Sequence, residues 1–188
     1  IMDRYIGKFF LPFFDKIGIP VYDADTRARS LMNDDPGLVS EITDLLGQEA
    51  YRDGSLDREY VAGKVFMNED LLNRLNRIVH PAVRDDYLQW VKERTDVPYV
   101  IEEAAILFES GAHRFMDLTV LVYAPEDLRI RRVMERDGVS EEEVRMRMRH
   151  QMNEEEKKKL ADQMISNDGT EMLLPQIIWL HEYILKNK

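Results

Sequence analysis

The most informative stretch of this sequence is Ile19-Pro20-Val21-Tyr22-Asp23-Ala24-Asp25-Thr26-Arg27-Ala28-Arg29. Its apolar beginning predicts a buried strand that ends in two carboxylates, Asp23 and Asp25, directly before a helix. In an open α/β sheet the carboxyl ends of strands face the ligand crevice, where such a carboxylate can take a proton or hold a metal. Strand alternation predicts that both carboxylates lie on one side, where one pKa rises unless cations such as Arg27 and Arg29 intervene. The alternative is an Asp N-cap followed by a solvated helical turn.

The composition excludes several classes of protein. The 188 residues have a net charge of −10, which argues against a nucleic-acid-binding surface, although local arginines can still bind small anions. The sequence has no cysteine, so disulfides and thiolate metal sites are excluded, in weak agreement with a cytoplasmic location. Apolar runs stay short of the roughly 20 residues that span a bilayer, and no cleavage site follows the N-terminal stretch, so we expect neither a membrane span nor a signal peptide.

Apolar strand-like segments alternate with helical patterns along the chain, which predicts a parallel sheet with right-handed helical crossovers. We expect strands near residues 3–7, 19–22, 98–102, 118–124 and 164–165. We expect helices near 9–17, 26–32, 38–46, 56–66, 69–79, 82–94, 126–137, 141–151, 154–160 and 170–185, the first one ended by Gly18. His80-Pro81 should interrupt a helix, because the residue before proline avoids the helical conformation. Two capping boxes are predicted, Ser140 with Glu143 and Asn153 with Glu156.

The segment 129–159 is dense in charge and predicts a mobile helical flap rather than core. Within it Arg132 and Arg136 share a helical face, and Arg147 shares one with Gln151. Guanidinium groups bind phosphate in a fork and remain charged, so this segment suits a polyphosphate ligand. The alternative is salt bridging with the nearby acids Glu135, Glu141, Glu142, Glu143, Glu154, Glu155 and Glu156.

Histidine and nucleophile motifs add little. His80 precedes a proline, and a lone histidine there is either a packed or capping residue or a ligand-binding one. The remaining histidines have no spacing that suggests a partner: His113, His150 and His181. The sequence contains neither H-E-x-x-H nor G-x-S-x-G, which disfavours metalloproteases and serine hydrolases.

Taken in order, the blocks of this sequence resemble the dephospho-coenzyme A kinase family. The resemblance extends from about residue 17 to the C-terminus, and it is the order and spacing of the blocks that make it specific. The matching blocks are Gly18 to Arg29, Asp53 to Arg58, Val65-Phe66, Leu75 to Pro81, Leu107 to Gly111, Arg132 with Arg136-Asp137, Arg147 to Gln151, and Ile165 to Gly169.

This resemblance implies one domain, 1–188, with a three-layer α/β P-loop kinase-like fold and a parallel sheet. A helical CoA-facing region would span about 33–95 and a helical lid about 138–162. The implied reaction transfers the γ-phosphate of ATP, with Mg²⁺, to the ribose 3′-hydroxyl of dephospho-CoA, the last step of coenzyme A synthesis. Its partners would be these small molecules, without nucleic acid or membrane, and the protein would be a cytoplasmic monomer or weak homo-oligomer.

Roles are carried over where a motif matches. Asp25 matches the proposed catalytic base, and no residue is assigned as a metal ligand. The expected substrate-side residues are Asp23, Arg29 and His80. The expected nucleotide-side residues are Gly7, Lys8, Arg132, Arg136, Arg147 and Asn167.

The sequence departs from the family at the phosphate-binding loop. It has no G-x-x-x-x-G-K-[ST]; Gly7-Lys8 is a remnant, and Phe9 stands where Ser or Thr should hold magnesium. The backbone of that loop cradles the phosphates, so its loss should abolish turnover. Either loop residues are missing from the sequence, which predicts a Cα–Cα gap above about 3.8 Å between Ile6 and Phe10, or the loop is deleted.

Three other functions stay open. A nucleoside or nucleoside-monophosphate kinase would share the sheet, loop and lid. A non-catalytic CoA- or nucleotide-binding module would follow from a true loop deletion. A purely structural helical protein is the least favoured, because it needs no acid-terminated strands beside an arginine-rich segment.

Overall fold

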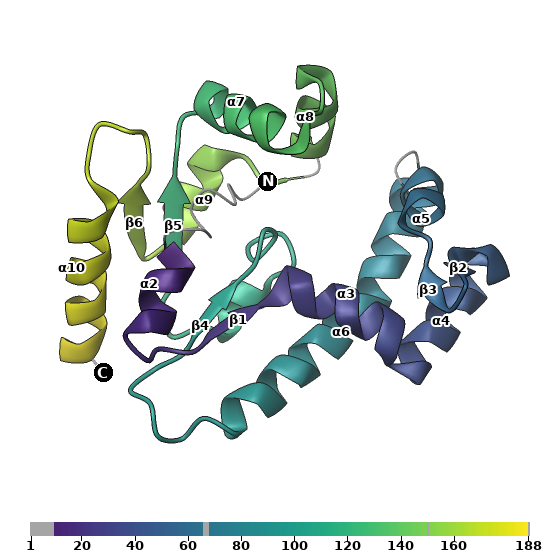
Figure 1. The fold of residues 1–188 in the computed structure, drawn as a ribbon, viewed down its shortest axis with the longest axis horizontal. Coiled ribbons are helices and arrows are strands. Elements are labelled where there is room, and N and C mark those ends of the chain that lie inside the picture. The colour runs from purple at the N-terminus through teal and green to yellow at the C-terminus, as the bar shows by residue number, and fades with distance from the viewer. Residues whose placement is uncertain (1–9, 66–67, 150, 188) are drawn as a thin grey trace. The chain divides into compact units, whose positions relative to one another are not determined.

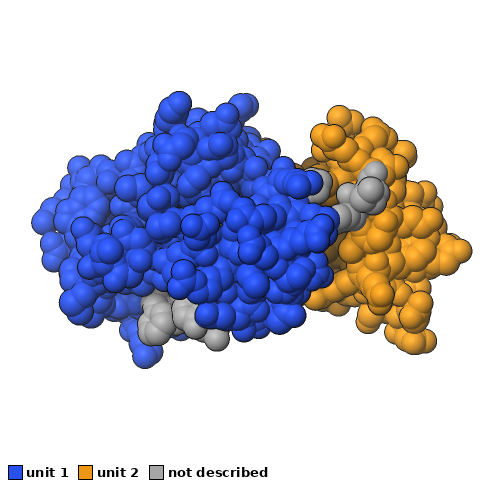
Figure 2. Space-filling view, turned by 90° about the horizontal axis from the view of Figure 1, so that it is seen from above, with its two compact units in different colours: residues 1–21, 104–188 blue, residues 22–103 orange. Residues whose placement is uncertain are grey.

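The computed structural model describes residues 10–65, 68–149 and 151–187 of a mixed α/β protein (Figure 1). Its contacts divide the chain into unit 1, residues 1–21 and 104–188, and unit 2, residues 22–103, which Figure 2 colours separately. The expected strand 3–7, the expected gap between Ile6 and Phe10, and the loop remnant Gly7-Lys8 lie outside the described residues.

Unit 2 is mainly helical. It contains α3 (Ala24–Asp34), α4 (Pro36–Leu46), η1 (Gln48–Ala50), α5 (Arg58–Val65) and α6 (Glu69–Lys92), with strands β2 (Tyr51–Arg52), β3 (Ser55–Leu56), β4 (Ile101–Glu103) and all but the first residue of β1 (Val21–Asp23). β1 pairs with β4, and β2 pairs antiparallel with β3. The β2–β3 turn has positive φ at both Asp53 (51°) and Gly54 (78°), the conformation that a two-residue hairpin loop requires.

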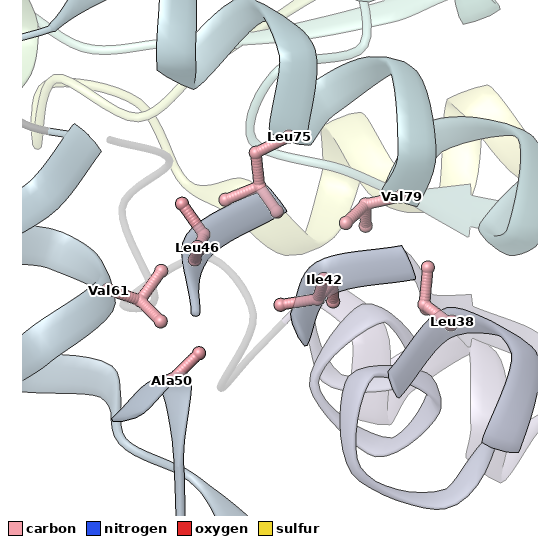
Figure 3. Packing of buried hydrophobic residues seen from close by; sticks show 7 residues of the cluster. All are labelled: Leu38, Ile42, Leu46, Ala50, Val61, Leu75 and Val79. Carbon is pink, nitrogen blue, oxygen red and sulfur yellow. The ribbon is translucent and has the colours of Figure 1, made fainter. Parts of the chain in front are cut away.

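The core of unit 2 is a cluster of buried aliphatic side chains between its helices (Figure 3). Three come from α4 at intervals of four residues, so one apolar stripe of that helix is buried. The cluster consists of Leu38, Ile42, Leu46, Ala50, Val61, Leu75 and Val79. This packing accounts for the predicted helices 38–46 and 56–66, which the structure confirms as α4 and α5 within a few residues.

Helix α6 runs from Glu69 to Lys92 with Pro81 inside it, so the expected interruption at His80-Pro81 is wrong. Proline costs about 3 kcal/mol within a helix, because it lacks an N–H and collides with the preceding turn. Burial on both sides of Pro81 outweighs that cost. Before it Val79 is buried, and after it Tyr87 packs edge-on against Tyr22 with ring centroids 5.1 Å apart. Tertiary packing therefore overrides the local preference.

Unit 1 combines a parallel strand pair with five helices and a short 3₁₀ turn among the residues described. It contains α2 (Phe10–Lys16), η2 (Ala112–Phe115), β5 (Val120–Tyr123), α7 (Glu126–Asp137), α8 (Glu141–Met148), α9 (Glu154–Leu160), β6 (Gln163–Ser166) and α10 (Leu173–Lys186). β5 and β6 pair in parallel, from Val120 beside Gln163 to Tyr123 beside Ser166, which confirms the predicted parallel strands. No helix in the described part of the chain has the length and apolarity that crossing a membrane requires.

Helix ends in unit 1 largely follow the sequence. Gly18 has φ +80° and follows α2, as predicted. Ser140 and Glu143 form the predicted reciprocal capping box at the start of α8. Asn153 caps α9, but its side chain accepts from the amide of Glu155 at 2.8 Å rather than from that of Glu156.

The charged segment 129–159 is not simply a flap, and the expectation that it lies outside the core is wrong in part. Ile130 and Val133 of α7 and Val144 of α8 are 4%, 1% and 0% exposed and pack together. The density of charged residues in the segment obscured these few apolar positions, whose spacing along each helix buries them.

Candidate active site

Strand β1 delivers two carboxylates to the start of α3. Asp23 is the N-cap: its Oδ1 accepts from the Thr26 amide at 2.8 Å and its Oδ2 accepts from the Thr26 hydroxyl at 2.7 Å. Asp25 is half-buried in the first helical turn. The N-cap interpretation is therefore confirmed for Asp23. The expected strand alternation of the two carboxylates is wrong, because the helix already begins at Ala24.

The carboxylate of Asp86, on α6, fixes this turn from both sides. Its Oδ2 accepts from the Tyr22 hydroxyl at 2.7 Å and from Arg27 Nε at 2.9 Å, and a second guanidinium nitrogen of Arg27 donates to Oδ1. The bonds from Arg27 hold the pKa of Asp86 below its usual value, and burial raises the pKa of Tyr22. Arg27, suggested as a counter-charge for Asp23 and Asp25, is thus paired with Asp86.

The other two expected substrate-side residues also belong to unit 2. Arg29 is half-buried on α3, and its carbonyl accepts from Asn33 Nδ2 at 2.6 Å. His80 is half-buried on α6, and burial lowers its pKa. At neutral pH this burial favours the uncharged imidazole, which can donate or accept a hydrogen bond.

In unit 1 the structure brings Arg132 and Asn167 together. Arg132 Nη1 donates to the Asn167 carbonyl at 3.1 Å, and the Asn167 amide donates to the Tyr123 carbonyl at 2.7 Å. Asn167 is 7% exposed, so this contact ties α7 to the turn after β6. Two residues that the sequence places on the nucleotide side thus lie together.

Asp137 brings a second pair together. Arg136 donates to it through Nε at 2.6 Å and Nη2 at 2.8 Å, and Arg147 Nη1 lies 3.6 Å from its Oδ2. Two guanidinium groups from α7 and α8 therefore share one carboxylate. A phosphate group offers the same kind of oxygen acceptors, with more charge.

Other arginines of this region follow the salt-bridging alternative. Arg145 pairs with Glu141 and Glu126, each at 2.8 Å. Arg129 pairs with Glu154 at 3.1 Å, and both side chains are mostly buried. These arginines hold α7, α8 and α9 to one another.

A carboxylate without an assigned role, Glu109, lies within the turns that follow β4. Its Oε1 accepts from the Met152 amide at 2.8 Å and lies 2.9 Å from Lys157 Nζ. Burial raises the pKa of Glu109, but hydrogen bonds from Lys157 and from backbone amides outweigh burial and hold that pKa below its usual value. Lys157 is itself buried, 8% exposed.

Sequence reasoning missed Asp86 and Lys157, and it quoted Glu109 within a motif without giving it a role. The partners lie 64 residues apart for Tyr22 and Asp86, and 43 for Met152 and Glu109, so no local spacing signals them. Glu102, the last residue of the expected strand 98–102, lies on β4. Burial raises its pKa to about 7.

Two shallow hollows lie elsewhere on the described surface, and neither Asp25 nor Arg147 lines them. One in unit 2 is lined by Glu41, Asp44, Leu45, Arg74, Arg77 and Ile78. One in unit 1 is lined by Asp127, Ile130, Arg131, Met134, Glu141 and Arg145. Both mix charges of either sign, so neither favours an anion by charge alone.

These features define the class of protein. Parallel strands, helices between them, carboxylates where β1 meets α3, and arginines on α7 and α8 are those of a phosphotransferase with a P-loop kinase-like fold. A crystal structure from Thermus thermophilus supports the fold, with a TM-score of 0.80 at 34% identity over 97% of this chain and 91% of that one.

Within this class the chain belongs to the dephospho-CoA kinase family, whose model matches residues 9–172. The dephospho-CoA kinase of Porphyromonas gingivalis is 39% identical over 170 residues, 89% of this chain and 83% of the relative. That of Salinibacter ruber is 41% identical over 162 residues, 84% and 81% of the two chains. A dephospho-CoA kinase structure from Campylobacter jejuni, 24% identical, covers 95% of this chain and 90% of its own and shares the fold with a TM-score of 0.67.

Proposed function

We propose that this protein is an ATP-dependent kinase that phosphorylates the ribose 3′-hydroxyl of dephospho-CoA. The observation that carries this proposal is the family match over residues 9–172, which includes both the β1–α3 turn and the arginines of α7 and α8. It would act in the cytoplasm, as a monomer or weak homo-oligomer.

Asp25 would accept the proton of the ribose hydroxyl, or orient that hydroxyl for in-line attack. The carboxylate lies at the N-terminus of α3, where the helix dipole stabilises negative charge. The bonds from Tyr22 and Arg27 to Asp86 hold this turn against α6, so the position of Asp25 is set by a rigid element. A positioned general base typically contributes about 10²–10⁴ in rate.

Asp23, Arg29 and His80 would bind dephospho-CoA. Capping does not exhaust Asp23, because a carboxylate offers about four lone-pair sites and Thr26 uses two. The neutral imidazole of His80 suits a hydroxyl or amide partner better than a phosphate. The surrounding helical region, about 33–95, would then face the CoA substrate.

Arg132, Arg136, Arg147 and Asn167 would bind ATP, with Gly7 and Lys8 beyond the described residues. The γ-phosphate would take over from Asp137 as the shared partner of Arg136 and Arg147. Closure of the lid, about 138–162, would exclude water from ATP.

Mg²⁺ would accompany ATP and offset charge on its phosphates. Among the residues that the structure describes, no three His, Asp or Glu side chains cluster as a metal site. Mg²⁺ does not need three protein ligands, because it usually binds through substrate phosphates, waters and one or two carboxylates.

A second candidate is a non-catalytic CoA- or nucleotide-binding module, and the observation that favours it is the absence of G-x-x-x-x-G-K-[ST] from the sequence. The two candidates differ in turnover. A third, a nucleoside or nucleoside-monophosphate kinase, differs in the acceptor it phosphorylates.

One panel of assays separates these candidates. The purified protein, first verified by mass to carry the phosphate-binding loop, is incubated with ATP and Mg²⁺ beside dephospho-CoA, adenosine or AMP, and the phosphorylated product is identified by chromatography and mass spectrometry. We expect CoA to form from dephospho-CoA only. CoA-ligand binding by calorimetry without ATP binding or turnover would support the module, and phosphorylation of adenosine or AMP would support the third candidate.

A further inference from the structure

We infer that Glu109 is a positioning residue: through Lys157 and the Met152 amide it holds the link between α8 and α9, and thereby sets where Arg147 lies. This inference rests on the proposed function for the role of Arg147, but its geometry does not. Glu109, Lys157, Met152 and Arg147 all belong to unit 1.

The first step is the anchor itself. Glu109 Oε1 lies 2.9 Å from Lys157 Nζ and accepts from the Met152 amide at 2.8 Å. The two side chains are 17% and 11% exposed, so water competes weakly for either charge. A buried ion pair is weak evidence for stability, and fixing one arrangement is its better-attested use. Here it fixes the backbone amide of Met152, which lies outside any helix or strand.

The second step connects the anchor to α8. The Gln151 amide donates to the Met148 carbonyl at 3.0 Å, and the Arg149 amide donates to the Arg145 carbonyl at 3.2 Å. Met152 therefore directly follows a residue that is hydrogen-bonded to the end of α8. Arg147 lies within the last turn of α8, one residue before Met148.

The third step is the packing of α8. Val144, in the middle of α8, is fully buried against Ile130 and Val133 of α7, and Met148 packs against the same cluster. Arg147 is thus carried between two fixed points, the Val144 contact and the Glu109 anchor. Removing the anchor leaves α8 held by the packing of Val144 and Met148 and by the Arg145–Glu126 pair, but without the fixed Met152 amide beyond its last turn, so we expect Arg147 to shift.

Hydrogen exchange and NMR of the ligand-free protein test the anchor without any turnover. In Glu109→Ala the Met152 amide should exchange on the order of tenfold faster, because it loses a charged acceptor, and the Arg147 Nε–H signal should shift. Glu109→Gln keeps an acceptor oxygen, so its Met152 exchange rate should lie between those of the wild type and Glu109→Ala. This second variant keeps the test valid if the alanine variant misfolds. Glu155→Gln is the control, because it breaks the exposed 2.7 Å pair with Lys158 on the same helix and should change neither signal.

Kinetics test the consequence. Glu109→Ala should lower kcat about tenfold to a hundredfold, the cost of a small misplacement, with the KM for dephospho-CoA unchanged. In Glu109→Ala/Arg147→Ala the second change should add almost nothing to Arg147→Ala alone. A merely structural Glu109 predicts that the two effects multiply.

The outcomes are distinguishable. Unchanged Met152 exchange and an unchanged Arg147 signal in both Glu109 variants would overturn the inference, whatever the activity. Multiplying kinetic effects would also overturn it. If the wild type is inactive but the Glu109 variants show the expected changes in exchange and NMR signal, the proposed function is contradicted. Glu109 then still stands as the residue that positions Arg147.

Discussion

Asp86 in unit 2 and Glu109 in unit 1 use the same chemistry on different kinds of backbone. Each carboxylate is mostly buried, 19% and 17% exposed, and each binds two donors from another segment. The donors to Asp86 are side chains, Tyr22 and Arg27, on either side of a helix start. One of the donors to Glu109 is the backbone amide of an irregular link. A helix satisfies its own backbone hydrogen bonds, so side-chain contacts are enough to fix its position. A residue outside helices and strands, such as Met152, needs a partner for its backbone amide.

The largest expected effect tests the catalytic role of Asp25, which lies in the turn that Asp86 holds in place. In a chain with an intact phosphate-binding loop, Asp25→Asn should lower kcat by about 10²–10³ with little change in ATP binding, because an amide cannot accept the hydroxyl proton. Asp34→Asn, at the other end of the same helix, is the control. Steady-state kinetics and calorimetry with ATP give the measurement. Near-normal turnover of Asp25→Asn would remove this residue from the mechanism.

The next effect is on stability. Asp86→Ala should lower the free energy of unfolding by about 2 kcal/mol, because it leaves the Tyr22 hydroxyl and the Arg27 guanidinium without their shared acceptor. Asp85→Asn, the exposed neighbour on α6, should change it by less than about 0.5 kcal/mol. Urea unfolding measures both.

The same comparison has a pH signature. The folded pKa of Asp86 is depressed, so its contribution is present above the unfolded value of 3.8 and is lost as pH falls through the lower folded value. The difference between wild type and Asp86→Ala should therefore shrink in strong acid. A difference that stays constant there would mean that the charge of Asp86 does not stabilise the fold.

A smaller effect separates two roles of Asp23. Asparagine caps a helix as well as aspartate, so Asp23→Asn should change the unfolding free energy by less than about 0.5 kcal/mol. If the carboxylate also binds substrate, the KM for dephospho-CoA should rise about tenfold while that for ATP stays the same, the loss of one charge-assisted hydrogen bond. Ser140→Ala at α8 is the matched cap deletion and should cost about 1 kcal/mol without a change in the KM for dephospho-CoA. Equal KM values for Asp23→Asn and wild type would leave Asp23 as a cap alone.

Local sequence signals predicted most of the fold. Gly18 after α2 and Ser140 before α8 are each recognised within a few residues, because capping is a local interaction. The parallel β5–β6 pair was likewise expected from an apolar run and a short later strand. Pro81 was misjudged because its helix is stabilised by packing, which a local pattern does not contain.

The candidate site also contains residues that local patterns indicate and residues that act only through distant contacts. Arg132 contacts Asn167, and Arg136 and Arg147 share Asp137; the resemblance assigns all four residues to the nucleotide side, a role that stays a prediction. Asp86, which holds the turn of Asp25, lies 64 residues from its partner Tyr22. Glu109, which we infer positions Arg147, lies 43 residues from its partner Met152. One chain without relatives beside it carries no signal for such pairs, since each partner looks like any surface charge.

Glu102 completes the comparison as a carboxylate whose pKa moves the other way, and it provides the smallest test. Burial raises its pKa from 4.5 to about 7, whereas donors lower the pKa of Asp86 and Glu109. Between those two pH values the folded protein binds the extra proton, so stability falls as pH rises from 4.5 toward 7 and then stays level. Glu102→Gln should therefore raise the unfolding free energy at pH 8 by about 1 kcal/mol, a value reduced for partial solvent screening, and change it little at pH 4. Urea unfolding at both pH values measures this, with exposed Glu135→Gln as the control. An equal gain at both would show that shape rather than charge sets the effect, and a loss at pH 8 would mean that the charged carboxylate has a partner in the folded protein, as Asp86 and Glu109 do.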